Sequence, residues 1–177
     1  MRRYELVAAV MVAVALTAGC NDTTSGTPST DSPTKIDAAV WNPCDGGIPD
    51  SALTANGYDP ATQRKDVAGV EFAGWKVCEW KATEFRLSVY SGDKPFDDLA
   101  KNPNLRDLGP VTVANREQAS RNQRAGRPDD AVCDVSIATR YGFATFSASP
   151  NNFAVHGLDV CGEALRTANA FEQYVPR

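Results

Sequence analysis

The five cysteines are the residues whose chemistry the sequence indicates most directly, and they are Cys20, Cys44, Cys78, Cys133 and Cys161. Exported proteins meet an oxidising compartment and tend to pair their thiols, so an odd number of cysteines needs an explanation. If Cys20 carries lipid, the other four can form two disulfides. The cysteines therefore predict one lipidation site and two crosslinks, and leave no thiol for a zinc site.

Groups suited to catalysis are sparse. The single histidine, His156, has no second histidine with which to share a metal, and no Gly-x-Ser-x-Gly motif marks a serine for it to activate. The adjacent acids at residues 97–98 and 129–130 point apart on either a strand or a helix, so neither pair forms a facing dyad. We expect a protein that is not an enzyme and holds no metal and no cofactor.

Aromatic and basic side chains are better candidates for binding. Trp75 and Tyr90 are candidates for lining a pocket for an apolar or sugar ligand, because aromatic side chains supply most of the contact area in such sites. A place in the core is the alternative for both, and is favoured for Trp80. Arg121 and Arg124 lie in a local basic stretch that either contacts an anionic polymer or partner protein, or is a solvated loop.

The N-terminus predicts export. Arg2 and Arg3 precede an uncharged apolar run over residues 6–16, which as a helix would rise only about 17 Å, far short of a bilayer core of about 30 Å. A cleaved signal over residues 1–19 is therefore favoured over a transmembrane helix. Residues 16–20 (LTAGC) resemble the lipobox of bacterial lipoproteins. This resemblance implies that Cys20 receives at least two acyl chains and anchors the chain to the cell membrane, on its extracytoplasmic side.

Composition then divides the mature chain. Residues 20–35 are rich in Ser, Thr, Pro and Asp and cannot bury enough apolar area to offset their ordering entropy, so we expect a flexible tether. Residues 36–177 have the usual size of one domain. The whole chain has 18 basic and 22 acidic side chains, a net charge of −4. This balance argues against nucleic acid as a partner, and it leaves the acyl chains as the main membrane contact.

Apolar periodicity predicts the elements that position these side chains. Residues 75–81 and 84–91 alternate apolar and polar side chains and predict an antiparallel hairpin, and residues 131–139 and 141–148 predict a second. Further predictions are a strand at 111–114, short helices at 49–57 and 95–101, a polar loop at 117–130 and an amphipathic helix from residue 159. These elements predict an α+β domain: an antiparallel sheet of four to six strands, with helices on one face.

The cysteine-centred motifs resemble those of one known family. The motifs are Asn42-Pro43-Cys44, Cys78-Glu79-Trp80, Cys133-Asp134-Val135 and Cys161-Gly162-Glu163-Ala164. Together they are similar to the actinobacterial lipoproteins that carry the domain of unknown function 3558 (DUF3558), over about residues 36–175. The resemblance implies an envelope lipoprotein of high-GC Gram-positive bacteria. It implies no activity, because the family has none established.

The four remaining cysteines allow three connectivities. Cys44–Cys78 with Cys133–Cys161 is favoured, because elements that are close in sequence tend to be neighbours in space. Cys44–Cys161 with Cys78–Cys133 stays open, and it would place the first segment beside the terminal helix. In the favoured pairing each crosslink would contribute about 3.5–4 kcal/mol in the chain-entropy model.

Two roles follow for a membrane-anchored extracytoplasmic lipoprotein. The first is a non-enzymatic module that binds an envelope protein, for which we expect an exposed apolar patch without a deep pocket. The second is a carrier of a small molecule or lipid, for which we expect an apolar pocket between the sheet and the helices.

Overall fold

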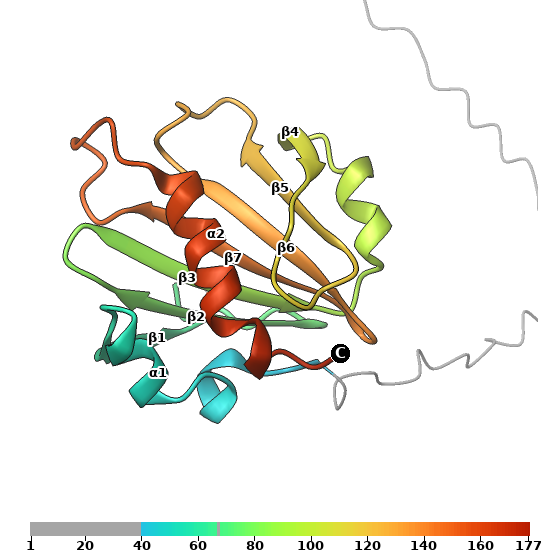
Figure 1. Cartoon of the computed structure of the whole chain (residues 1–177), viewed down its shortest axis with the longest axis horizontal. Helices are drawn as coiled ribbons and strands as arrows, with labels where there is room; N and C mark the ends of the chain where they lie inside the picture. Colours follow the sequence, from blue (N-terminus) through green and yellow to red (C-terminus); the bar gives the residue numbers. More distant parts are fainter. Residues whose placement is uncertain (1–39, 67) are drawn as a thin grey trace, which may run out of the picture. The chain divides into compact units, whose positions relative to one another are not determined.

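The computed structural model describes residues 40–66 and 68–177 (Figure 1). The expected signal, Cys20 and the tether lie outside these residues. Within the described part of the chain, no helix combines the length and apolar character needed to cross a membrane.

Seven strands form one antiparallel sheet, in the order β1-β2-β3-β7-β6-β5-β4. They are β1 (Asp59–Lys65), β2 (Trp75–Lys81), β3 (Phe85–Gly92), β4 (Leu105–Pro110), β5 (Ala119–Arg124), β6 (Cys133–Thr139) and β7 (Gly142–Pro150). The helical elements are η2 (Pro43–Gly47), α1 (Asp50–Ala55), η3 (Phe96–Lys101), α2 (Val160–Phe171) and η4 (Glu172–Tyr174). The α+β class and both predicted hairpins are confirmed, whereas the expected four to six strands are too few.

The sheet is larger than expected because three of its strands are polar. The predicted loop at residues 117–130 contains β5, and β1 and β4 were not predicted at all. The predicted strand at residues 111–114 is wrong, since this segment leaves β4 and runs to α2. There Val113 is fully buried, and the backbone N–H of Ala114 donates to Asn169 Oδ1 at 2.9 Å.

One face of the sheet packs against α2 and forms the core (Figure 1). The fully buried side chains on this face include Trp80, Leu87, Val89, Val135, Ile137 and Phe146, and α2 adds Ala164, Ala168 and Phe171. The rings of Phe146 and Phe171 stack with their centroids 6.4 Å apart. Helix α2 begins after Asp159, whose Oδ1 accepts a hydrogen bond from the Gly162 N–H at 2.8 Å. The predicted amphipathic helix is therefore confirmed, and Asp159 caps its start.

Both disulfides join neighbouring elements. Cys44–Cys78 ties η2 to β2, and Cys133–Cys161 ties β6 to the first turn of α2. The favoured pairing is confirmed and the alternative, Cys44–Cys161 with Cys78–Cys133, is wrong. The core and both disulfides lie within residues 40–177. A chain that begins at residue 20 therefore contains every residue of the core and of the disulfides.

A buried ion pair fixes the segment that follows α2. Arg116 Nε lies 3.1 Å from Glu172 Oε2, and the two side chains are only 4% and 5% exposed. The same guanidinium donates to the Pro176 carbonyl at 3.1 Å and to the carbonyls of Glu172 and Val175. One side chain thus binds the end of the chain to the segment before β5.

We expect Arg116→Met to lower the free energy of unfolding by about 3–5 kcal/mol, because it leaves the buried Glu172 carboxylate without its cation. Chemical denaturation measures this change. Arg121→Met is the matched control, since Arg121 is exposed and its loss should stay within about 0.5 kcal/mol. Equal effects of the two substitutions would contradict a stabilising role for the buried pair.

Candidate ligand-binding site

The face of the sheet that points away from α2 carries both polar and aromatic side chains, and we call it the open face. A row of side chains crosses five strands there, because the register aligns Val77, Tyr90, Thr145, Ser136 and Ser120. The next positions along β5 and β6 bring Asn122 opposite Asp134. Asn122 is 1% exposed, Asp134 2% and Ser136 0%. A polar surface buried to this degree is unusual, because the transfer of polar groups out of water costs free energy unless they find hydrogen-bond partners.

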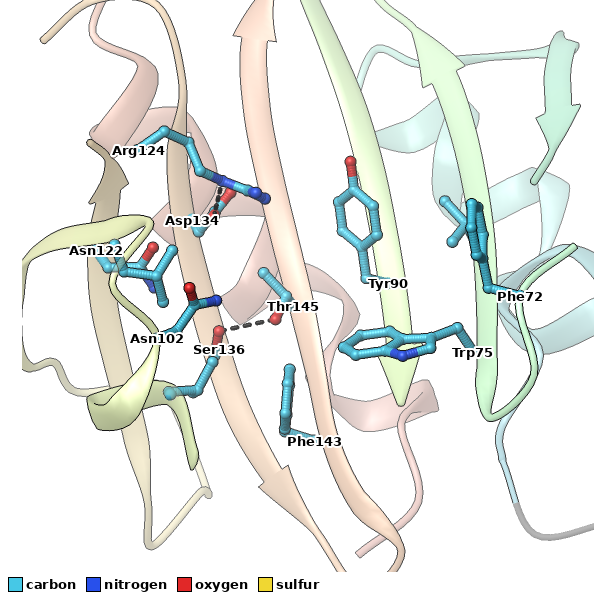
Figure 2. A pocket seen from close by; sticks show the side chains of 13 residues that line it. Phe72, Trp75, Tyr90, Asn102, Asn122, Arg124, Asp134, Ser136, Phe143 and Thr145 are labelled. Atoms are coloured by element: carbon cyan, nitrogen blue, oxygen red, sulfur yellow. Dashed lines mark hydrogen bonds and ion pairs between the residues drawn. The ribbon is translucent and has the colours of Figure 1, made fainter. Parts of the chain in front are cut away.

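A cavity of about 310 Å³ lies on this face, near the lower end of the roughly 300–1,000 Å³ typical of small-molecule sites. The lining near β2 is apolar, with Phe72, Trp75, Val77 and, from β7, Phe143. The lining toward β5 is mainly polar, with Asn102, Asn122, Arg124, Asp134, Ser136 and Thr145, and Leu99 of η3 and Leu105 of β4 lie at this same end. Tyr90 also lines the cavity, and Figure 2 shows it beside Trp75.

The apolar wall depends on one glycine. Trp75 pairs with Gly92 across β2 and β3, and a Cβ on Gly92 would come within 2.8 Å of the Trp75 ring. The absence of that carbon lets the indole lie over β3. There the indole and the Phe143 ring form a T-shaped pair, with 5.6 Å between centroids and an interplanar angle of 76°. This edge-to-face pair fixes the orientation of the wall.

The polar side is held by hydrogen bonds between strands. Arg124 Nε donates to Asp134 Oδ2 at 2.8 Å, and the hydroxyls of Ser136 and Thr145 lie 2.8 Å apart (Figure 2). Asp134 Oδ1 and Asn122 Oδ1 are buried and accept no hydrogen bond from the described residues. Buried acceptors of this kind cost free energy until they meet a donor. A ligand that carries an N–H or O–H group would remove that cost.

Arg124 and Tyr90 meet where the two sides join. The Arg124 side chain is 40% exposed, and Figure 2 shows its guanidinium extending from β5 toward Tyr90. Burial raises the pKa of the Tyr90 phenol, and the Asp134 charge adds to this effect, whereas Arg124 and a hydrogen bond from Ser88 oppose it. Tyr90 therefore stays neutral at physiological pH and can donate a hydrogen bond.

The structure brings three of the four predicted contact residues together, since Trp75, Tyr90 and Arg124 all line the cavity. Arg121 pairs with Val135 and so shares the α2 face of the sheet, where it is exposed. Only alternate residues of a strand share a face, so residues 121 and 124 lie on opposite faces of β5.

The other candidates lie outside the cavity. Trp80 belongs to the core, as the alternative interpretation held. His156 is exposed, with its Nδ1 3.2 Å from Asp130 Oδ2. The Gly157 N–H, helped by His156, lowers the pKa of Asp130. In residues 40–66 and 68–177, no three His, Cys, Asp or Glu side chains gather as a possible metal site.

The cavity is not where the sequence analysis expected a pocket. The space between the sheet and α2 is filled by core side chains, and the cavity lies on the opposite face, where η3 contributes Leu99. Phe143, Asp134 and Asn122 were not proposed as contact residues. The apolar alternation of residues 131–148 already implied a polar opposite face containing Asp134, and this was the available signal.

Comparisons with known proteins give one match. The family model described as "Protein of unknown function (DUF3558)" matches residues 15–174 of the chain. That range includes both disulfides and every residue that lines the cavity. The comparisons with curated proteins and with solved structures give no match.

The raised pKa of Tyr90 predicts a pH dependence of stability. The folded protein holds this phenolic proton more tightly than the unfolded chain, whose tyrosines titrate near pH 10. The stabilisation is complete below about pH 10 and is lost as the pH rises through the folded pKa. Phenolate absorbance is titrated for the folded wild type and for Tyr90→Phe. The variant should lack one phenol, and that phenol should ionise above about pH 10 in the folded wild type. If the missing phenol instead ionises at the same pH as the tyrosines of the denatured chain, the raised pKa of Tyr90 is contradicted.

Proposed function

The chain belongs to the DUF3558 family, and we propose that it is a lipid-anchored extracytoplasmic binding protein that holds a small ligand in the cavity of its open face. One observation carries the proposal: an aromatic wall and a hydrogen-bonded polar side face the same cavity. Ligand sites typically combine a mainly apolar lining with a few fixed polar groups that orient the ligand.

The sequence supports the location. The apolar run, the lipobox-like residues 16–20 and the flexible composition of residues 20–35 together favour an exported chain anchored at Cys20. Two disulfides suit a compartment in which thiols oxidise. A tether between the anchor and the domain would leave the cavity accessible from the aqueous side of the membrane.

The chemistry of the cavity favours binding over catalysis. A nucleophilic hydroxyl needs a base to take its proton. The Ser136 and Thr145 hydroxyls bond to each other, and the Asp134 carboxylate is bound to Arg124. The lining groups thus hold one another in place, as suits a preformed binding site.

An envelope protein is the second candidate partner. Val70, Phe72, Phe153 and Val155 are large apolar side chains that the described part of the chain leaves exposed. They lie on two loops, residues 68–74 and 151–158. Apolar side chains gathered on a surface mark contacts with other proteins when they form a continuous patch.

The anchor is tested by Cys20→Ala in the native host. Without the thiol no acyl chain can be attached, so the protein should appear in the medium or remain unprocessed at the size of its precursor. Cell fractionation and mass measurement distinguish these states. A variant that stays in the membrane at its processed mass would show that Cys20 is not the anchor.

The cavity is tested with N-phenylnaphthylamine, a neutral aromatic dye whose fluorescence rises in apolar surroundings. The mature chain from residue 20, made without acyl chains, should bind the dye. Trp75→Ala should weaken binding by about tenfold, because it removes the main contact surface of the wall.

Trp41→Ala is the matched control, since Trp41 packs against the core and does not line the cavity. Circular dichroism verifies that both variants are folded. Equal dye affinities of the two variants would place the bound dye elsewhere on the protein.

A further inference from the structure

The cavity continues past Tyr90 and Arg124 into a second hollow of about 450 Å³, since both residues line the two spaces. The second hollow is polar. Its lining includes Glu79, Arg86, Ser88, Arg127 and Ser147. The two hollows thus form one groove, aromatic at the Trp75 end and polar at the Arg127 end, with Tyr90 and Arg124 at the junction.

Positive charge exceeds negative charge along this groove. Its lining holds three guanidinium groups, of Arg86, Arg124 and Arg127, and two carboxylates, of Glu79 and Asp134. Glu79 is within 3.6 Å of Arg86, and Asp134 binds Arg124. The Arg127 side chain makes no hydrogen bond or ion pair with the described residues. A local excess of cations in a chain of net charge −4 is complementary to an anion.

Arg124 is oriented to receive that anion. Its Nε is bound to the buried Asp134 carboxylate, whereas Nη1 and Nη2 have no partner among the described residues. The side chain remains 40% exposed at the junction. A guanidinium held in this way presents two parallel N–H donors, which match the oxygen spacing of a carboxylate, phosphate or sulfonate.

We propose that the ligand is a small amphipathic anion, with a planar apolar body against Trp75 and Phe143 and an acidic group on Arg124. This assignment rests on the proposed function and adds the chemical class of the ligand. The volume of the aromatic end suits one ring system better than the two chains of a membrane lipid. Tyr90 and the unpartnered oxygens of Asn122 and Asp134 can bind polar groups between the two ends.

Two dyes that share one scaffold test the charge requirement. Anilinonaphthalene sulfonate is N-phenylnaphthylamine with an added sulfonate, so the pair differs only in the acidic group. The mature chain should bind the sulfonate at least about tenfold more tightly than the neutral dye, because a charge-assisted hydrogen bond is added. Added salt should reduce this preference.

Arg124→Gln should abolish the preference for the sulfonate over the neutral dye. Arg121→Gln, an arginine substitution on the opposite face of the same strand, should keep it. Because Arg124→Gln leaves a buried carboxylate without its cation, the double variant Arg124→Gln/Asp134→Asn is measured as well. It removes both charges and should also lack the preference.

The outcomes separate the two proposals. If both dyes bind equally and both depend on Trp75, the cavity stands and the anionic class is overturned. A preference that survives in both Arg124 variants overturns the role of Arg124. If neither dye depends on Trp75, the proposed binding function itself fails.

Discussion

The site depends on the alternation of side chains along the strands of a single antiparallel sheet. On β6, Cys133, Val135 and Ile137 face α2, whereas Asp134 and Ser136 face the cavity. A slip of one residue would exchange these sets, with carboxylate and hydroxyl groups entering the apolar core. The Cys133–Cys161 disulfide links this strand to the helix that covers it. The same crosslink that stabilises the core therefore maintains the polar face opposite.

Burial of polar groups on the open face costs free energy that the core must offset. Arg124 and Asp134 offset each other, and the hydroxyls of Ser136 and Thr145 satisfy each other. Buried polar atoms of Asp134, Asn122 and Ser120 have no hydrogen-bond partner among the described residues, so their burial is not compensated. In a binding protein that residual cost is useful, since a ligand with a matching donor gains the hydrogen bond without having to reorganise the site.

The sequence predicts the elements with strong apolar periodicity and misses those without it. The hairpin strands and α2 bury a continuous apolar set, so their patterns identify them. Strands β1 (DPATQRK) and β5 (ASRNQR) have no such set. The first is an edge strand, and the second turns Ser120 and Asn122 toward the open face. Their polar composition is that of a loop, and only pairing with β2 and β6 reveals them as strands.

Some contact residues could be predicted from their types, but their assembly into one site could not. Trp75, Tyr90 and Arg124 are good contact residues by type, yet their convergence depends on a strand order that places β7 between β3 and β6. This order is a long-range property that local patterns do not contain. Arg121 and Arg124 also lie on opposite faces of β5, a difference that the composition of this basic stretch does not show.

Native mass spectrometry of the mature protein, extracted from its own membrane in mild detergent, tests the central claim most directly. Our account predicts a small extra mass, beyond the acyl chains, that leaves on gentle activation and is absent from a Trp75→Ala/Arg124→Gln variant. The account would be contradicted by a bare wild-type protein, by a protein-sized adduct alone, or by the same small mass on both proteins.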